Sequence, residues 1–210
     1  MCCRYYLPYD PDITEALDRL PLAISMRDKL GRPLNTAGEV RPTDIVPAFA
    51  PSKASAITLF PMVFGFSGKF FNTRLETAAT KPMWEDSWAS HRCALPFSWY
   101  YEWRQVPTEG GRKATKEKML IQPVGFHYAY FAGLYRIEES AEIKYPTFTI
   151  LTTTPSPSVS DIHDRMPVIL APDKIEEWVD PRSRPETVVK TALTDMMVDV
   201  APPEAPRIYA

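Results

Sequence analysis

The residue of greatest chemical interest is Cys2, which directly follows Met1. A small residue at position 2 permits removal of the initiator methionine, and this removal would leave Cys2 with a free α-amine beside its thiol. An α-amine has a pKa near 7.7–8.0, so roughly 10–20% of it is neutral at pH 7, against about 0.04% for a lysine. Such an amine forms an imine with an aldehyde, and the thiol can then close onto the imine carbon as a durable thiazolidine ring. Taken alone, a cysteine at this position is more often incidental.

A second polar cluster lies in the segment FFNTRLET, where Asn72, Arg74 and Glu76 are spaced two residues apart. These side chains share one face if the segment is extended. Asn72 offers donors and an acceptor that would orient a small polar group, and Arg74 offers a planar fork that suits phosphate. The alternative is an ordinary strand end with no role in chemistry.

A third candidate is Glu102, which stands between Tyr101 and Trp103 in the segment WYYEWRQ. We expect aromatic rings around this carboxyl group, and such surroundings favour the protonated acid that proton transfer requires. The alternative is an exposed carboxylate that pairs with Arg104.

The fourth candidate is His163 in the compact polar run IHDRMP, which separates two apolar segments. Histidine is the residue best suited to acid and base catalysis near neutral pH. The alternative is a structural ion pair between Asp164 and Arg165, with His163 an uninvolved surface residue. His91 and His127 lack comparable polar neighbours.

Composition limits the classes of function. The formal charge of −2 over 210 residues argues against DNA binding by bulk electrostatics, so a DNA partner would need a local groove. No run of 18 apolar residues predicts a membrane span. The three cysteines are an odd number and two are adjacent, which favours a reducing cytoplasm over a disulfide framework. A zinc site built from Cys2, Cys3, Cys93 and His163 would lack the usual ligand spacing, so we predict neither a metal nor a cofactor.

The elements that must position these residues are short, because 22 prolines interrupt the chain against only 8 glycines. Helical spacing predicts a helix over residues 12–30, broken by Pro21, and another over 76–90 with Trp84 and Trp88 on one face. Alternating segments predict a strand near 45–48, a hairpin of two strands over 54–68, and strand, turn, strand over 91–105. Further strands are expected at 119–125, 128–137 and 146–154, with 110–118 as a hairpin tip. Asp173 is expected to cap a short helix.

This pattern predicts one α+β domain over residues 1–210, in which a curved, barrel-like and mostly antiparallel sheet carries flanking short helices. The last residues, 200–210, are expected to form an extended surface tail.

The four clusters together resemble the SOS-response-associated peptidase (SRAP) family, whose members process abasic sites. The resemblance covers most of residues 1–172, and it rests on MCCR, NTRLET, RCALPFSWYYEW, FAGLY, and TILTTT followed by IHDRMPVIL.

The resemblance implies a DNA repair protein that crosslinks itself through Cys2 to abasic sites in single-stranded DNA, after removing its own Met1. Asn72 would hold the Cys2 end or the opened sugar, and Arg74 would bind the adjacent phosphate. Glu102 would transfer protons during imine formation and ring closure, and His163 would move the proton that opens the sugar or releases the crosslink. The DNA-binding residues predicted on this basis are Arg4, Phe71, Arg74 and Arg165. We expect a cytoplasmic monomer that is associated with the nucleoid when crosslinked.

The sequence departs from the family at three places: Cys3 replaces the usual glycine, Glu39 a common asparagine, and Phe64 a typical tryptophan. Stacking of an unpaired base would then fall to Phe66, Phe70 or Phe71. Two other functions stay open. One is a peptidase acting in trans with the Cys2 thiolate and His163 as its base, and the other is a module that binds single-stranded DNA without covalent chemistry.

Overall fold

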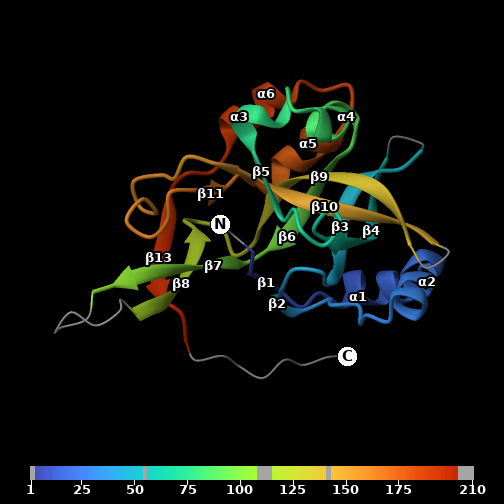
Figure 1. Ribbon diagram of the computed structural model, residues 1–210, viewed down its shortest axis with the longest axis horizontal. Helices are drawn as coiled ribbons and strands as arrows, with labels where there is room; N and C mark the ends of the chain where they lie inside the picture. Colours follow the sequence, from blue (N-terminus) through green and yellow to red (C-terminus); the bar gives the residue numbers. More distant parts are fainter. Residues whose placement is uncertain (1–2, 54–55, 108–114, 141–142, 203–210) are drawn as a thin grey trace.

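The structure, a computed structural model, describes residues 3–53, 56–107, 115–140 and 143–202 (Figure 1). It has the predicted α+β architecture, in which two β-sheets are surrounded by short helices. The first strands are β1 (Tyr5–Leu7), β2 (Gly38–Val40), β3 (Ile45–Pro51), β4 (Ile57–Phe64), β5 (Asn72–Arg74), β6 (Arg92–Phe97) and β7 (Trp99–Val106). The later strands are β8 (Thr115–Pro123), β9 (Ala129–Ser140), β10 (Ile143–Thr153), β11 (Met166–Pro167), β12 (Ile169–Leu170) and β13 (Met196–Val200).

The helices are brief, as the proline content predicts. They are α1 (Pro11–Asp18), α2 (Pro21–Leu30), α3 (Leu75–Ala78), α4 (Pro82–Ser90), α5 (Ile175–Val179) and α6 (Pro185–Val188), with short 3-10 helices at Pro172–Lys174 and Val189–Thr191.

The larger sheet closes on itself as a barrel of five strands. Its strands follow one another in the order β10, β4, β3, β6 and β9, and β9 pairs again with β10. Most neighbours are antiparallel, whereas β10 runs parallel to β4 and to β5. Closure removes the open edges of this sheet and encloses aromatic and aliphatic side chains, among them the stacked rings of Phe97 and Phe131.

The smaller sheet has the order β13–β8–β7–β1–β2, so the N-terminal strand lies between β2 and β7. One face of this sheet packs on the barrel, where the ring of Tyr5 meets Phe131 edge to face at 5.3 Å. Successive residues of a strand point to opposite faces. On β7, Tyr100 and Glu102 therefore point inward and are buried, whereas Trp99 and Trp103 point outward and are partly exposed.

Prolines set the helix boundaries as the sequence predicts, with one refinement. Pro21 begins α2, and Asp10 caps α1 by accepting hydrogen bonds from the backbone of Asp12 and Ile13. The single helix predicted over 76–90 is instead two helices, because Pro82 starts α4 as a new element. Both tryptophans of that segment are buried.

Two predictions of local structure were wrong, and one strand was missed. Residues 57–64 form the single strand β4 in place of a hairpin within 54–68, and β4 pairs along its length with β3. The partner of β4 is thus a strand that precedes it in the chain. The turn at Gly65–Gly68 follows β4 and does not interrupt it. Asp173 does not cap a helix, since it lies inside a 3-10 turn and Lys174 occupies the N-cap of α5. Strand β13 was not predicted; the rest of the expected tail, 203–210, lies outside the described residues.

The strand, turn, strand prediction over 91–105 is confirmed, yet β6 and β7 belong to different sheets. Only Ser98 separates them, and here the chain crosses from the barrel to the smaller sheet. Strands β7 and β8 form the predicted hairpin, while most of its tip, 108–114, lies outside the described residues.

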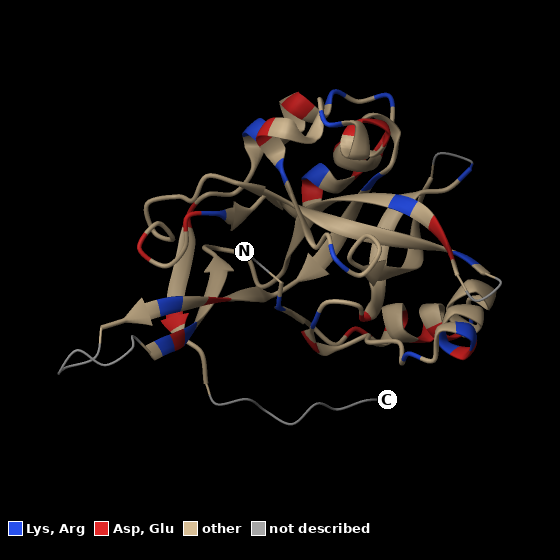
Figure 2. Ribbon diagram, in the orientation of Figure 1, with Lys and Arg blue, Asp and Glu red and all other residues tan. Residues whose placement is uncertain are grey.

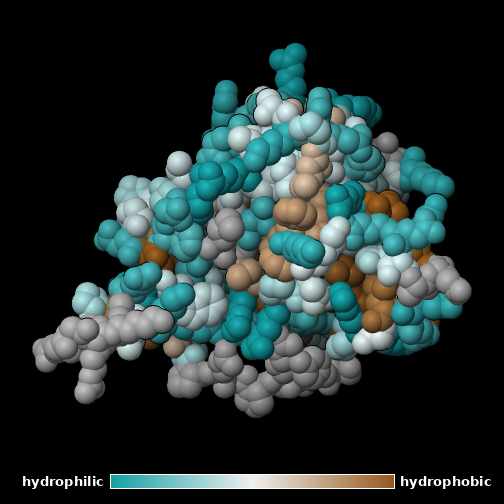
Figure 3. Space-filling view, viewed as in Figure 1, coloured by the Kyte–Doolittle hydropathy of each residue, from teal (hydrophilic) through white to brown (hydrophobic). Residues whose placement is uncertain are grey.

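Positive and negative side chains are interspersed over the elements (Figure 2), and the face in Figure 3 is mostly hydrophilic with small separate hydrophobic areas. Among the described residues no helix is long and apolar enough to cross a membrane.

Candidate functional site

Strands β1 and β7 place Cys3 opposite Glu102. Tyr5 pairs with Tyr100, and the backbone N–H of Tyr101 donates to the carbonyl of Arg4 at 3.0 Å, so one further step of this register brings Cys3 to Glu102. Burial raises the pKa of the Cys3 thiol, and the nearby charge of Glu102 raises it further. The Cys3 thiol is therefore protonated at neutral pH and a weak nucleophile.

Glu102 is buried, with 3% of its surface exposed. The alternative in which it pairs with Arg104 is wrong, because Arg104 binds Glu117 on β8 at 2.5 Å. Glu102 and Arg104 are two positions apart and therefore point to the same face of the sheet. Arg104 lies nearer the tip of the β7–β8 hairpin, where its side chain is 42% exposed. Glu102 is thus a buried carboxyl group, and it lies opposite Cys3, the first residue that the structure describes.

Asn72 begins β5, beside Ile150 on β10. Its side-chain oxygen is buried and accepts no hydrogen bond from any residue in the described ranges. An unsatisfied buried amide oxygen costs about 1–3 kcal/mol, so this atom is ready to accept a hydrogen bond from a ligand. Arg74, at the other end of β5, is exposed where α3 begins.

Arg165 is held by a bidentate ion pair. Its two terminal nitrogens donate to the carboxylate of Glu76 at 2.7 and 2.8 Å, and one of them also donates to the carbonyl of Thr152 at 2.6 Å. The hydrogen bond from Arg165 lowers the pKa of Glu76. The alternative ion pair between Asp164 and Arg165 is therefore wrong, since Glu76 is the partner of this arginine.

His163 has two competing contacts at Nδ1. The backbone N–H of Arg165 lies 3.1 Å away and needs an unprotonated Nδ1, whereas the carboxylate of Asp164 lies 2.7 Å away and needs a protonated one. Nδ1 can therefore accept from the backbone of Arg165 or, when it carries a ring proton, donate to Asp164.

The two groups of residues lie around one hydrophobic core. The ring of Tyr5 packs on Phe64, and Phe64 packs at 5.7 Å on Phe71, which directly precedes Asn72. Val159 and Ile162, from the segment that leads to His163, belong to the same core. Cys2 itself lies outside the described residues.

Of the rings considered for base stacking, Phe66 is fully buried and Phe71 is partly buried against the core. Phe70 is 41% exposed and is the best placed of the three. Within the described ranges, no three His, Cys, Asp or Glu side chains are grouped as metal ligands would be.

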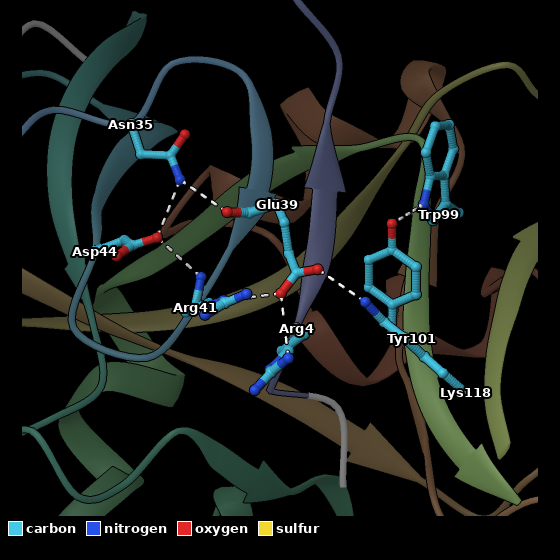
Figure 4. A network of polar contacts seen from close by, with 8 residues as sticks. All are labelled: Arg4, Asn35, Glu39, Arg41, Asp44, Trp99, Tyr101 and Lys118. Atoms are coloured by element: carbon cyan, nitrogen blue, oxygen red, sulfur yellow. Dashed lines mark hydrogen bonds and ion pairs between the residues drawn. The ribbon is translucent and has the colours of Figure 1, made fainter. Parts of the chain in front are cut away.

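Arg4 points to the outer face of β1, away from Glu102, where it joins a network that sequence reasoning missed (Figure 4). Its guanidinium lies 3.3 Å from the carboxylate of Glu39 on β2, and Arg41 and Lys118 bind the same carboxylate. The alternation of side chains along the N-terminal strand could have indicated that Arg4 points outward. It could not have indicated Glu39 or Lys118 as neighbours, because the pairing of β1 with β2 and of β7 with β8 depends on the topology of the sheet.

Comparison with known proteins places this geometry in a family. Residues 1–202 match the family described as SOS response associated peptidase (SRAP). The chain is 40% identical over 117 residues to the abasic site processing protein YoaM of Bacillus subtilis, which covers 55% of this chain and 49% of that protein. It is 28% identical over 108 residues to the abasic site processing protein YedK of Escherichia coli, covering 51% of this chain and 46% of that protein. The matched part thus spans about half the length of these relatives.

Solved structures share the fold. The crystal structure of a protein from Bacteroides thetaiotaomicron matches with a TM-score of 0.70 at 19% identity, over 95% of this chain and 91% of the other. A phage-related protein from Bordetella bronchiseptica matches with a TM-score of 0.69 at 23% identity, over 97% and 95% of the two chains. The match over residues 1–202 is decisive, and the chain belongs to the SOS response associated peptidase (SRAP) family.

Proposed function

We propose that this protein captures the aldehyde of abasic sites in single-stranded DNA through Cys2, after Met1 is removed, and forms a covalent thiazolidine crosslink. The observation that carries the proposal is the buried carboxyl group of Glu102 opposite Cys3, the immediate neighbour of Cys2. The names of the relatives as abasic site processing proteins supply the substrate class.

The chemistry proceeds without a change of oxidation state. The Cys2 amine attacks the aldehyde carbon of the opened sugar, and water leaves to give an imine. The thiol then adds across the C=N bond: sulfur bonds to the carbon and the nitrogen takes up a proton. Glu102 serves as the proton donor and acceptor of these steps, because an interior carboxyl group can exchange protons without competition from bulk water.

Other residues bind and prepare the sugar. The buried oxygen of Asn72 accepts a hydrogen bond from a sugar hydroxyl or from the Cys2 amine, and exposed Arg74 binds the next phosphate. His163 exchanges the proton that opens the sugar ring and, in the reverse direction, helps to release the crosslink. Arg165 holds the backbone around His163 through its pair with Glu76.

The test is adduct formation with an oligonucleotide that contains one abasic site, followed on a denaturing gel. The processed protein should give a shifted band; Cys2→Ala should give none, and Cys2→Ser at most a reversible imine. Cys3→Ser is the matched control, because it removes a thiol one residue away and should leave the adduct intact. The intact mass of each preparation reports whether Met1 is absent.

Other results would select another function. An adduct that survives Cys2→Ala would refute the proposal, as would the absence of any adduct from the processed protein. Hydrolysis of added peptides that depends on Cys2 would favour a peptidase acting in trans. Salt-sensitive binding without an adduct would favour a non-covalent module for single-stranded DNA.

A further inference from the structure

Three cations surround a single carboxylate on the outer face of the smaller sheet. Arg41 donates from Nε to Oε1 of Glu39 at 2.8 Å, Lys118 donates from Nζ to Oε2 at 2.8 Å, and Arg4 lies 3.3 Å from Oε1. Burial alone would raise the pKa of Glu39, but the hydrogen bonds from Lys118 and Arg41 outweigh it and lower the pKa. Glu39 is therefore ionised at neutral pH and accepts hydrogen bonds from all three cations.

The cations lie on aromatic rings. Nζ of Lys118 is 3.9 Å from the centre of the Tyr101 ring, and the guanidinium of Arg4 is 5.3 Å from the centre of the Trp103 ring. Arg4 and Arg41 retain about a third of their side-chain exposure, whereas Glu39 retains 13%. The two arginines are thus more exposed than the carboxylate that they bind, whereas Lys118, at 17%, is nearly as buried as Glu39. Figure 4 shows the contacts of this network.

The network is close to the proposed nucleophile along the chain. Arg4 follows Cys2 by two residues, which is at most about 7 Å of extended backbone. Phosphates in one DNA strand are separated by a rise of roughly 3.4 Å per nucleotide, so a strand whose abasic site reaches Cys2 carries phosphates within reach of Arg4.

We propose that Arg4, Arg41 and Lys118 form a phosphate-binding site for single-stranded DNA, and that Glu39 is its internal competitor. This inference rests on the proposed function. A phosphate entering the site takes over the hydrogen bonds that the carboxylate now accepts, so each binding event must displace Glu39. Competition from Glu39 weakens the binding of undamaged strands, whereas a strand with an abasic site is still retained by its covalent bond to Cys2. The selectivity for abasic DNA over undamaged DNA thus comes in part from the repulsion between Glu39 and phosphate.

The test compares Glu39→Gln with the wild type for binding of an unmodified single-stranded oligonucleotide, by fluorescence anisotropy over a series of salt concentrations. This probe has no aldehyde, so covalent capture does not contribute. Glu39→Gln should bind about fivefold or more tightly at low salt, because a charge-assisted contact to phosphate no longer competes with a carboxylate. The slope of log K against log salt should steepen by about 0.7, which corresponds to one more neutralised phosphate on a single strand.

Glu138→Gln is the matched control. Glu138 is 16% exposed and binds Arg136, so its replacement makes the same change in net charge at a comparable ion pair on β9. This variant should bind like the wild type. Equal gains in affinity from both variants would show an effect of net charge alone and would overturn the inference, as would an unchanged affinity of Glu39→Gln.

A second variant tests the same phosphate-binding site if Glu39→Gln does not fold. Arg41→Gln removes one cation and keeps the backbone hydrogen bond from its N–H to Asp44. It should weaken binding and make the salt slope shallower by about 0.7, and unchanged binding would contradict the site. Adduct formation with the abasic oligonucleotide, measured in parallel, separates the two ideas: an adduct without these changes in affinity rejects only the phosphate site, and the changes without an adduct reject only covalent capture.

Discussion

Gly65 has to be glycine because the ring of Phe71 occupies the space of a side chain there. A Cβ atom built at Gly65 would lie 2.5 Å from two carbons of the Phe71 ring, and the backbone has a φ of +108°. Phe71 also fixes the start of β5, since its carbonyl accepts a hydrogen bond from Ile150 at 2.9 Å. Gly65→Ala should therefore push Phe71 away and disturb Asn72, the next residue.

The magnitude has two parts. The left-handed backbone costs an alanine about 1–2 kcal/mol, and the forced movement of a packed ring adds about 1–3 kcal/mol. Gly125→Ala is the matched control, because it has a φ of +81° with no atom within 4 Å of the new Cβ. It should lose only the backbone part.

The assay is thermal unfolding, in which 1 kcal/mol corresponds to roughly 2–4 °C for a chain of this size. We expect the melting temperature to fall by roughly 10 °C for Gly65→Ala and by roughly 4 °C for Gly125→Ala. In a Phe71→Leu background the cost of Gly65→Ala should shrink by about 1 kcal/mol or more, because the contacting ring is gone. Equal losses from the two glycine variants would refute the steric argument.

Three further predictions concern stability and reactivity. Glu39→Gln should lower the free energy of unfolding at pH 7; because the folded pKa of Glu39 is depressed, the deficit should shrink as pH falls below the ordinary value of 4.5 and vanish only below the depressed pKa, and a deficit independent of pH in urea titrations would contradict this. Arg92→Gln should cost about 3 kcal/mol or more, since the buried guanidinium donates to the carbonyls of four residues, and an unchanged urea midpoint would show that these bonds are dispensable. Cys93 is fully buried and its thiol pKa is raised by burial, so iodoacetamide should modify it only after unfolding; rapid labelling of Cys93 in the native protein, detected by peptide mass, would contradict the burial.

The order of the elements could be predicted because its causes are local. Pro21 was predicted to end one helix and begin the next, because its missing N–H and fixed φ act on its immediate neighbours, and alternating apolar residues likewise favour a strand from a few adjacent positions. The hairpin predicted over 54–68 failed because the partner of β4 is β3, and a strand carries no local mark of which other strand it joins.

For the candidate site, the sequence by itself determined the residue types: a cysteine that can become the N-terminus, followed by an asparagine, a carboxyl group and a histidine in a family order. Only the tertiary structure decided their partners. Glu102 is buried beside Cys3 and not paired with Arg104, Arg165 binds Glu76 and not Asp164, and Glu39 binds cations from three separate segments of the chain. The physical reason is that an ion pair depends on sheet register and barrel closure, which join segments up to 89 residues apart. A local sequence pattern does not specify which of these distant segments come together.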